Sequence, residues 1–129
     1  MAKWVNSNVL DQGINYIKTN ATKMYLIKAY AAGDTYATVI GNALNAGVTM
    51  ASTDYTLGNG ASSARTLTTA TGKTDTATVS SGATPNLHIA WTDGSANVLW
   101  VTDETSDQVV TSGNTINFPA VTYTSNQPV

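Results

Sequence analysis

The chain has 129 residues and no cysteine, which excludes disulfides, zinc–thiolate sites and thiol nucleophiles. Because small secreted domains are often cross-linked by disulfides, the missing cysteines favour assembly in a reducing cytoplasm. Charge is scarce as well: Asp, Glu, Lys and Arg make up 11% of the chain, against about 25% in typical proteins. The length fits one domain, so we predict a single β-sandwich domain over residues 1–129.

Runs of positive charge and long apolar stretches are also missing. The formal net charge is -2 and the basic residues are scattered, whereas nucleic-acid binding requires clustered Lys and Arg. No segment approaches the roughly 20 apolar residues that span a bilayer, and the N-terminus lacks the apolar core of a signal peptide. We therefore expect no nucleic-acid partner, no membrane partner and synthesis in the cytoplasm without export.

The polar content is instead rich in Thr, Ser, Asn and Gly, which suits short strands and turns. Only residues 9–19 predict a helix, capped by Ser7 or Asn8, with Asp11 in the first turn where the helix dipole favours a negative charge. Its apolar residues fall near the spacing of one helical face: Val9, Leu10, Ile14 and Ile17.

The rest of the chain predicts short strands at spacings of roughly 8–12 residues, the pattern of a sandwich or barrel. Apolar residues on both sides of the strand at 23–30 predict a central position. Pro119 marks a bulge, bend or edge in the last strand, because proline cannot donate to a ladder. We predict an all-β, jelly-roll-like β-sandwich of about 8 strands with one short N-terminal helix. The other predicted strands are 35–40, 47–52, 65–71 and 74–80 as one hairpin, 86–92, 95–102, 108–110 and 115–124.

Asp93-Gly94 is a strong two-residue hairpin turn between residues 86–92 and 95–102. Counting outward from the turn places both tryptophans of the hairpin on one face, and a slip of one residue would reverse both. The predicted pairs are Trp91 with Ala96, Ile89 with Val98, and Leu87 with Trp100. We expect Trp91 and Trp100 to be core residues.

No arrangement of residues in the sequence predicts catalysis or a cofactor. His88 is the one histidine and lies within a strand, without a recognisable nucleophile–base–acid spacing. The acidic cluster Asp103, Glu104 and Asp107 offers oxygen ligands for calcium, but it lacks the spacing of a known calcium loop, so we favour a solvated loop. We predict a protein that is not an enzyme and holds no metal or cofactor.

Several stretches resemble a known protein family. They are Trp-Val-Asn-Ser-Asn-Val-Leu-Asp at residues 4–11, Tyr-Ile-Lys at 16–18, Leu-His-Ile-Ala-Trp-Thr-Asp-Gly at 87–94, Leu-Trp-Val-Thr-Asp-Glu at 99–104 and Asn-Phe-Pro at 117–119. Together they resemble the small proteins encoded beside the major capsid protein in tailed bacteriophages. Some members of that group are head decoration, or cement, proteins.

The resemblance implies a jelly-roll-like protein on the outer surface of the phage head, where it clamps subunits of the major capsid protein as a homodimer or homotrimer. We hypothesise that residues 1–8 form an extended arm that contacts the capsid or a sister copy. The arm's contact residues would be Trp4, Val5, Asn6 and Asn8. The alternative is a carbohydrate- or receptor-binding module of a virion, which predicts two or more exposed Trp or Tyr side chains on one face.

Overall fold

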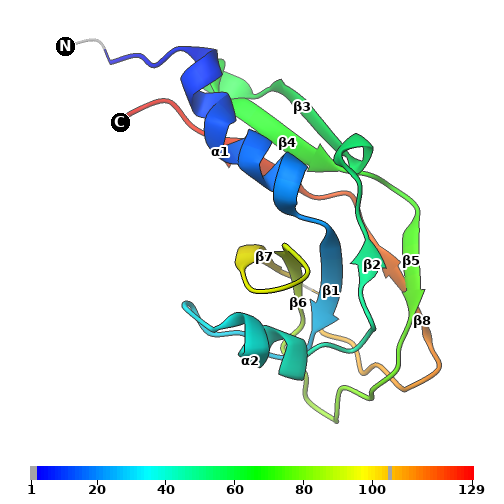
Figure 1. Ribbon diagram of the computed structural model, residues 1–129. Coiled ribbons are helices and arrows are strands. Elements are labelled where there is room, and N and C mark those ends of the chain that lie inside the picture. The colour runs from blue at the N-terminus through cyan, green and yellow to red at the C-terminus, as the bar shows by residue number, and fades with distance from the viewer. Residues whose placement is uncertain (1–2, 105) are drawn as a thin grey trace.

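The computed structural model describes residues 3–104 and 106–129, which form nine strands and one main helix (Figure 1). The helical elements are α1 (Ser7–Asn20), α2 (Tyr36–Gly41) and the 3₁₀ turns η1 (Ser52–Asp54) and η2 (Ala61–Ser63). The strands are β1 (Lys23–Ile27), β2 (Val48–Thr49), β3 (Tyr55–Asn59), β4 (Arg65–Thr69), β5 (Lys73–Thr76), β6 (His88–Thr92), β7 (Val98–Asp103), β8 (Thr115–Phe118) and β9 (Thr122–Ser125).

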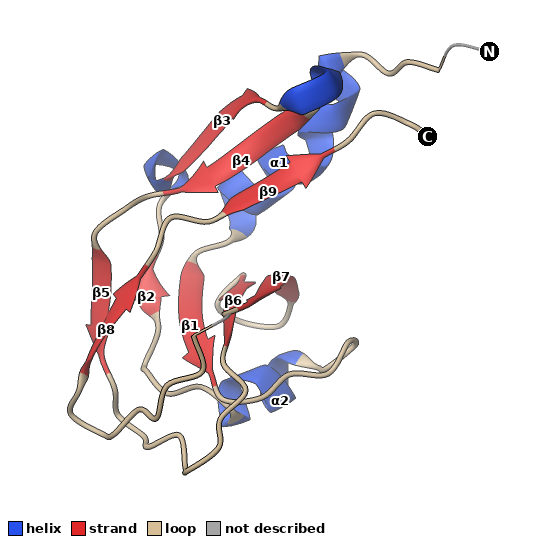
Figure 2. Ribbon diagram, turned by 180° about the vertical axis from the view of Figure 1, so that it is seen from behind, coloured by secondary structure: helices blue, strands red, loops and turns tan. Residues whose placement is uncertain are grey.

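The strands form three antiparallel sheets with the orders β2-β1-β6-β7, β3-β4-β9 and β5-β8. The prediction of a β-rich fold with one N-terminal helix is confirmed at this level. α1 lies against the β3-β4-β9 sheet, while α2 lies at the other end of the molecule (Figure 2).

β1 lies between β2 and β6 and is buried on both faces, which confirms its predicted central position. Met24 and Leu26 join the main core, which also takes in residues of α1 and of the other two sheets. Tyr25 and Ile27 pack on the opposite face against Val39 of α2. The alternation of side chains along a strand therefore joins β1 to two separate clusters of buried residues.

β6 and β7 form the predicted hairpin, but in a different register. Trp91 lies opposite Trp100 rather than Ala96, and the two indole rings stack with centroids 4.0 Å apart. The observed partner of Trp91 is residue 100, whereas the predicted partner was residue 96. The two positions differ by an even number of residues, so both tryptophans lie on the same face, as predicted. The face of the two tryptophans was predicted correctly, but the pairing was wrong. Val98, predicted on that face, instead lies on the opposite one with Ala90, because the bulge shifts the alternation.

A loop longer than two residues causes this change of register. The Asp93 carboxylate accepts hydrogen bonds from the backbone N–H groups of Ser95, Ala96 and Asn97 at 3.0, 2.8 and 2.9 Å. The side-chain amide of Asn97 donates to the other carboxylate oxygen at 2.7 Å. These bonds stabilise a loop over residues 93–97, and a bulge follows where the ladder resumes.

We expect this loop to lose stability in acid. Hydrogen bonds from the backbone N–H groups of Ala96, Asn97 and Ser95 hold the pKa of Asp93 below its ordinary value of 3.8. A pKa that is lowered in the folded state stabilises the fold above the ordinary pKa, and this contribution is lost as the pH falls below it. Thermal unfolding measured from about pH 5 to about pH 2 should therefore depend on pH more steeply for the wild type than for Asp93→Asn. Equal slopes would contradict the expectation.

Residues 35–40 form most of α2, so the predicted strand there is wrong. The Thr35 side chain accepts a hydrogen bond from the backbone N–H of Thr38 at 3.3 Å and caps the helix. Val39 is 1% exposed and packs on Tyr25 and Ile27. This one buried residue stabilises the short helix, because its contact with β1 outweighs the strand preference of this Thr- and Val-containing segment.

β4 and β5 do not pair with each other, so the predicted hairpin of residues 65–71 and 74–80 is wrong. β4 lies between β3 and β9, and β5 pairs with β8 in another sheet. β4 is a central strand because it is paired on both edges, and Leu67 at its centre is fully buried in the main core. Pro119 does interrupt the last predicted strand: β8 ends before it and β9 begins after it in a different sheet. Residues 108–110 form no strand.

Candidate functional site

The predicted contact segment lies beside the C-terminal segment (Figure 1). The backbone N–H of Val5 donates to the side-chain oxygen of Gln127 at 2.8 Å, and the Gln127 amide donates to the Val5 carbonyl at 2.9 Å. Trp4 precedes this contact and is 68% exposed. Residues 1 and 2 of the predicted arm lie outside the described residues.

The predicted arm over residues 1–8 is shorter than expected, because α1 begins at Ser7. Asn6, rather than Ser7 or Asn8, caps the helix: its side-chain oxygen accepts a hydrogen bond from the Asn8 backbone N–H at 2.8 Å. Of the four predicted contact residues, Trp4 and Asn8 are exposed without a structural task for their side chains, whereas Asn6 holds the helix start.

The outward face of α1 carries large apolar groups. Val9 is 62% exposed and Tyr16 is 58% exposed, and a spacing of seven residues places them on one side of the helix, two turns apart. Gly13 lies between them, and a Cβ added there would meet no atom within 4 Å. Val9 therefore does not share the buried face of Ile14 and Ile17, contrary to the prediction.

The charged residues of α1 point to the protein instead of the solvent. The Arg65 guanidinium donates to the Asp11 carboxylate at 2.7 Å, and the Lys18 ammonium donates to the Tyr55 carbonyl at 2.8 Å. Asp11 thus forms a salt bridge to β4. It was expected in the first turn of the helix but lies beyond that turn. All exposed residues of α1 are uncharged, and we call them the uncharged α1 face: Ser7, Asn8, Val9, Gln12, Gly13, Tyr16 and Thr19.

An open hollow of about 430 Å³ lies between the N-terminal segment and the turn that joins β3 to β4. Its lining residues are Trp4, Val5, Ser7, Asn59, Gly60, Ser63, Arg65 and Gln127. The hollow and the uncharged α1 face meet at the start of α1, so a partner could contact both.

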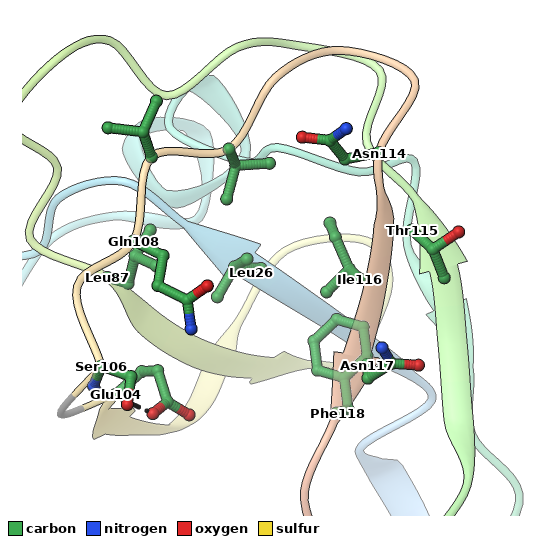
Figure 3. Close-up of a pocket in the computed structure, with 12 residues that line it drawn as sticks. Leu26, Leu87, Glu104, Ser106, Gln108, Asn114, Thr115, Ile116, Asn117 and Phe118 are labelled. Carbon is green, nitrogen blue, oxygen red and sulfur yellow. Dashed lines mark hydrogen bonds between the residues drawn. The ribbon is translucent and has the colours of Figure 1, made fainter.

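A second hollow, of about 410 Å³, lies between β8 and the segment that follows β7, beside Leu26 of β1 (Figure 3). Its floor is apolar, with Leu26, Leu87, Ile116 and Phe118. Among the described residues that line it, Glu104 is the one ionisable group, and its carboxylate accepts a hydrogen bond from the Ser106 N–H at 3.2 Å. A single carboxylate does not supply the pair of groups that general acid–base hydrolysis needs.

His88 lies near one member of the acidic cluster, Asp103, while Asp107 has a separate contact. The His88 ring lies 3.7 Å from the exposed Asp103 carboxylate and faces the ring of Tyr30. Asp107 accepts a hydrogen bond from the Leu87 backbone N–H at 2.7 Å. No group of three His, Cys, Asp or Glu side chains suited to a metal ion occurs within residues 3–104 and 106–129.

Trp91 is a core residue, as predicted, whereas Trp100 is half-buried and packs against the core. The Trp100 ring stacks on Trp91 and forms a T-shaped pair with the Tyr123 ring. Within the described ranges, neither α1 nor any other helix has the length and apolarity needed to cross a bilayer.

Comparisons with protein-family models, curated protein sequences and solved structures each return no match. The geometry of the N-terminal region is therefore the basis for the function proposed below.

Proposed function

We propose that this chain is a structural virion protein that binds the outside of a tailed-phage head and stabilises contacts between major capsid protein subunits. The uncharged α1 face carries the proposal. Charged residues are depleted and Trp and Tyr are enriched in the buried centres of protein interfaces. α1 has this composition on its outward side, with Val9 and Tyr16 exposed and Trp4 just before it.

The proposed mechanism is adhesion without chemistry. The Asp11–Arg65 salt bridge holds α1 in place, as do Ile14 and Ile17 in the core. Little conformational entropy is therefore lost when its outward face binds a partner. A homodimer or homotrimer that spans two capsid subunits gains from effective concentration, so each contact can be weak. A jelly-roll-like arrangement of the sheets and assembly from the host cytoplasm onto the virion belong to the same proposal.

A carbohydrate- or receptor-binding virion module is the alternative. Such a module needs aromatic faces open to a sugar ring, and Trp91 is buried beneath Trp100. Trp4, Tyr16 and Tyr123 are the exposed Trp and Tyr side chains among the described residues, and such a site could use them. A glycan array separates the two functions, since a cement protein gives no specific hits on it.

The Trp4→Ala variant tests the contact. We expect it to bind empty heads at least about 30-fold more weakly than the wild type, because truncation of an interface tryptophan commonly costs about 2 kcal/mol or more. The heads are assembled from the major capsid protein whose gene the proposal places beside the gene for this chain, and binding is measured by cosedimentation. Val109→Ala is the matched control: Val109 is 60% exposed but lies in the loop after β7, away from α1.

Circular dichroism and thermal melting should show that Trp4→Ala folds normally, because the hydrogen bonds between the Val5 backbone and the Gln127 side chain are kept, as is the Asn6 cap. Normal head binding by a folded Trp4→Ala protein would exclude Trp4 from the contact. Wild-type protein that stays in the supernatant at all concentrations would overturn the proposed function itself. The absence of a capsid gene beside the gene for this chain would also count against it.

A further inference from the structure

β7 has an open outer edge. It is the last strand of the four-stranded sheet and, with six residues, the longest strand in the described part of the chain. Apart from the ladder with β6, the backbone of residues 99–102 forms no hydrogen bond within residues 3–104 and 106–129. Figure 1 shows no helix or strand beyond β7 on that side. The edge is therefore available for pairing with another strand.

The direction of the free backbone groups follows from the ladder. The Glu104 N–H donates to the carbonyl of Leu87, just before β6, at 2.9 Å. The backbone N–H and carbonyl groups of the even-numbered residues at this end of β7 therefore point to β6. The Thr92 carbonyl of β6 accepts from Thr22, on the β1 side, which agrees with this alternation. The N–H and carbonyl of Val101 consequently both point outward from the sheet.

Most of the usual protections of an edge are missing from β7. Natural proteins guard edges with lysine, proline, inward-pointing charges or a bulge. The bulge of β7 lies near its start, beside Thr92, which leaves residues 100–103 regular. The strand has no proline or lysine, and its one charged residue is Asp103 at the end: its sequence is Val98, Leu99, Trp100, Val101, Thr102 and Asp103. Such an edge favours pairing with an extended strand.

We infer that the occupant is β7 of a second copy of this chain, antiparallel and related by a two-fold axis that places the two Val101 residues opposite each other. Both Val101 backbone groups point outward, so the pair exchanges two N–H···O bonds. Two four-stranded sheets then join into one continuous sheet. Two-fold symmetry fits, because the same edge then serves as both halves of the interface.

The charge on β7 favours this arrangement over a parallel one. In the antiparallel register, the two Asp103 residues lie at opposite ends, about 14 Å apart at about 3.4 Å per residue. That separation exceeds the Debye length of about 8 Å at physiological salt, so their repulsion is screened. A parallel pair would bring the two carboxylates to about 5 Å, the spacing of neighbouring strands. This dimer does not depend on binding to a phage head.

Sedimentation velocity over a range of protein concentrations tests the inference. We expect a monomer–dimer equilibrium for the wild type and at least about 30-fold weaker dimerisation for Val101→Pro, which removes the outward N–H without touching a bond to β6. Val101→Ala is the matched control, because it shortens the side chain but keeps the N–H. We expect it to dimerise within about threefold of the wild type. Circular dichroism verifies that each variant is folded.

Amide hydrogen exchange of the wild type provides a measurement that does not rely on a variant. The Val101 amide should exchange more slowly as the protein concentration rises, whereas the Thr102 amide, inside the ladder with β6, is already protected in the monomer. A wild type that remains monomeric at all concentrations would overturn the inference. Equal losses in Val101→Pro and Val101→Ala, or concentration-independent exchange at Val101, would overturn it as well. Failure to bind heads would leave this result unchanged.

Discussion

Replacing Trp91 with alanine should lower the free energy of unfolding by about 3–5 kcal/mol, a large part of the roughly 5–15 kcal/mol available to a domain of this kind. Trp91 is the largest fully buried side chain and its ring stacks on Trp100. Alanine would leave a cavity where β6 meets the main core and would remove this aromatic contact. Urea unfolding followed by circular dichroism gives the change in free energy.

Trp91→Phe is the informative companion variant. The Trp91 indole N–H is buried without a hydrogen-bond partner in the described structure, so phenylalanine removes an unpaired polar group along with part of the ring. We expect Trp91→Phe to cost about 1–2 kcal/mol, well below the alanine variant. Equal losses for both variants would mean that the volume of the cavity does not determine the loss of stability at this position.

The central hairpin shows how far sequence reasoning reaches. Alternation of apolar residues placed Trp91 and Trp100 on one face correctly, because any register shift by an even number of residues preserves the face. The register itself depends on Asp93, whose carboxylate accepts three backbone N–H groups and enlarges the loop. Asp-Gly is compatible with both the short and the longer loop, so the sequence alone does not select between them.

Strand pairing was harder to predict than strand position. β4 and β5 are both rich in Thr and have weakly apolar faces, so no cross-strand pattern distinguishes β5 from β3 or β9 as the partner of β4. The segment at α2 was assigned wrongly for a related reason: contact with Tyr25 and Ile27 decides its conformation, and that contact is distant in sequence.

The candidate site was predicted in part. Trp4 was recognised because a tryptophan before a helix must fold back or meet a partner, and it is exposed. Val9 and Tyr16 were missed as outward residues. Their spacing of seven residues places them on one side of a helix, whereas Ile14 and Ile17 fall on a different side. The inward direction of the charge on Asp11 could not be foreseen, because its partner Arg65 lies on a distant strand.

Asn45 is the second position where we expect a large effect. The residue is 4% exposed, and its side chain joins β1 to β5. The amide oxygen accepts from the Leu26 backbone N–H at 2.9 Å, while the amide nitrogen donates to the Met24 carbonyl at 3.4 Å and to the Asp75 carboxylate at 2.9 Å. Only a group that accepts on one side and donates on the other satisfies this position.

Asn45→Asp should therefore destabilise the protein by about 3–5 kcal/mol at neutral pH, because a buried carboxylate would face Asp75 with no proton between them. Burial and the like charge raise the pKa of the introduced carboxyl. Its protonated form can donate to Asp75, so the variant should regain stability as the pH falls through that raised pKa, opposite in sign to the acid effect at Asp93.

Thermal melting of Asn45→Asp and Asn45→Ala at several pH values between about 7 and about 4 separates charge from shape at this position. Alanine removes the same three hydrogen bonds without adding a charge, so we expect a loss of about 1–3 kcal/mol that varies little with pH. A loss in Asn45→Asp that is equally independent of pH would show that solvent reaches the carboxyl. The hydrogen bonds between β1 and β5 would then be exposed to water, and they would contribute little to the stability of the two sheets.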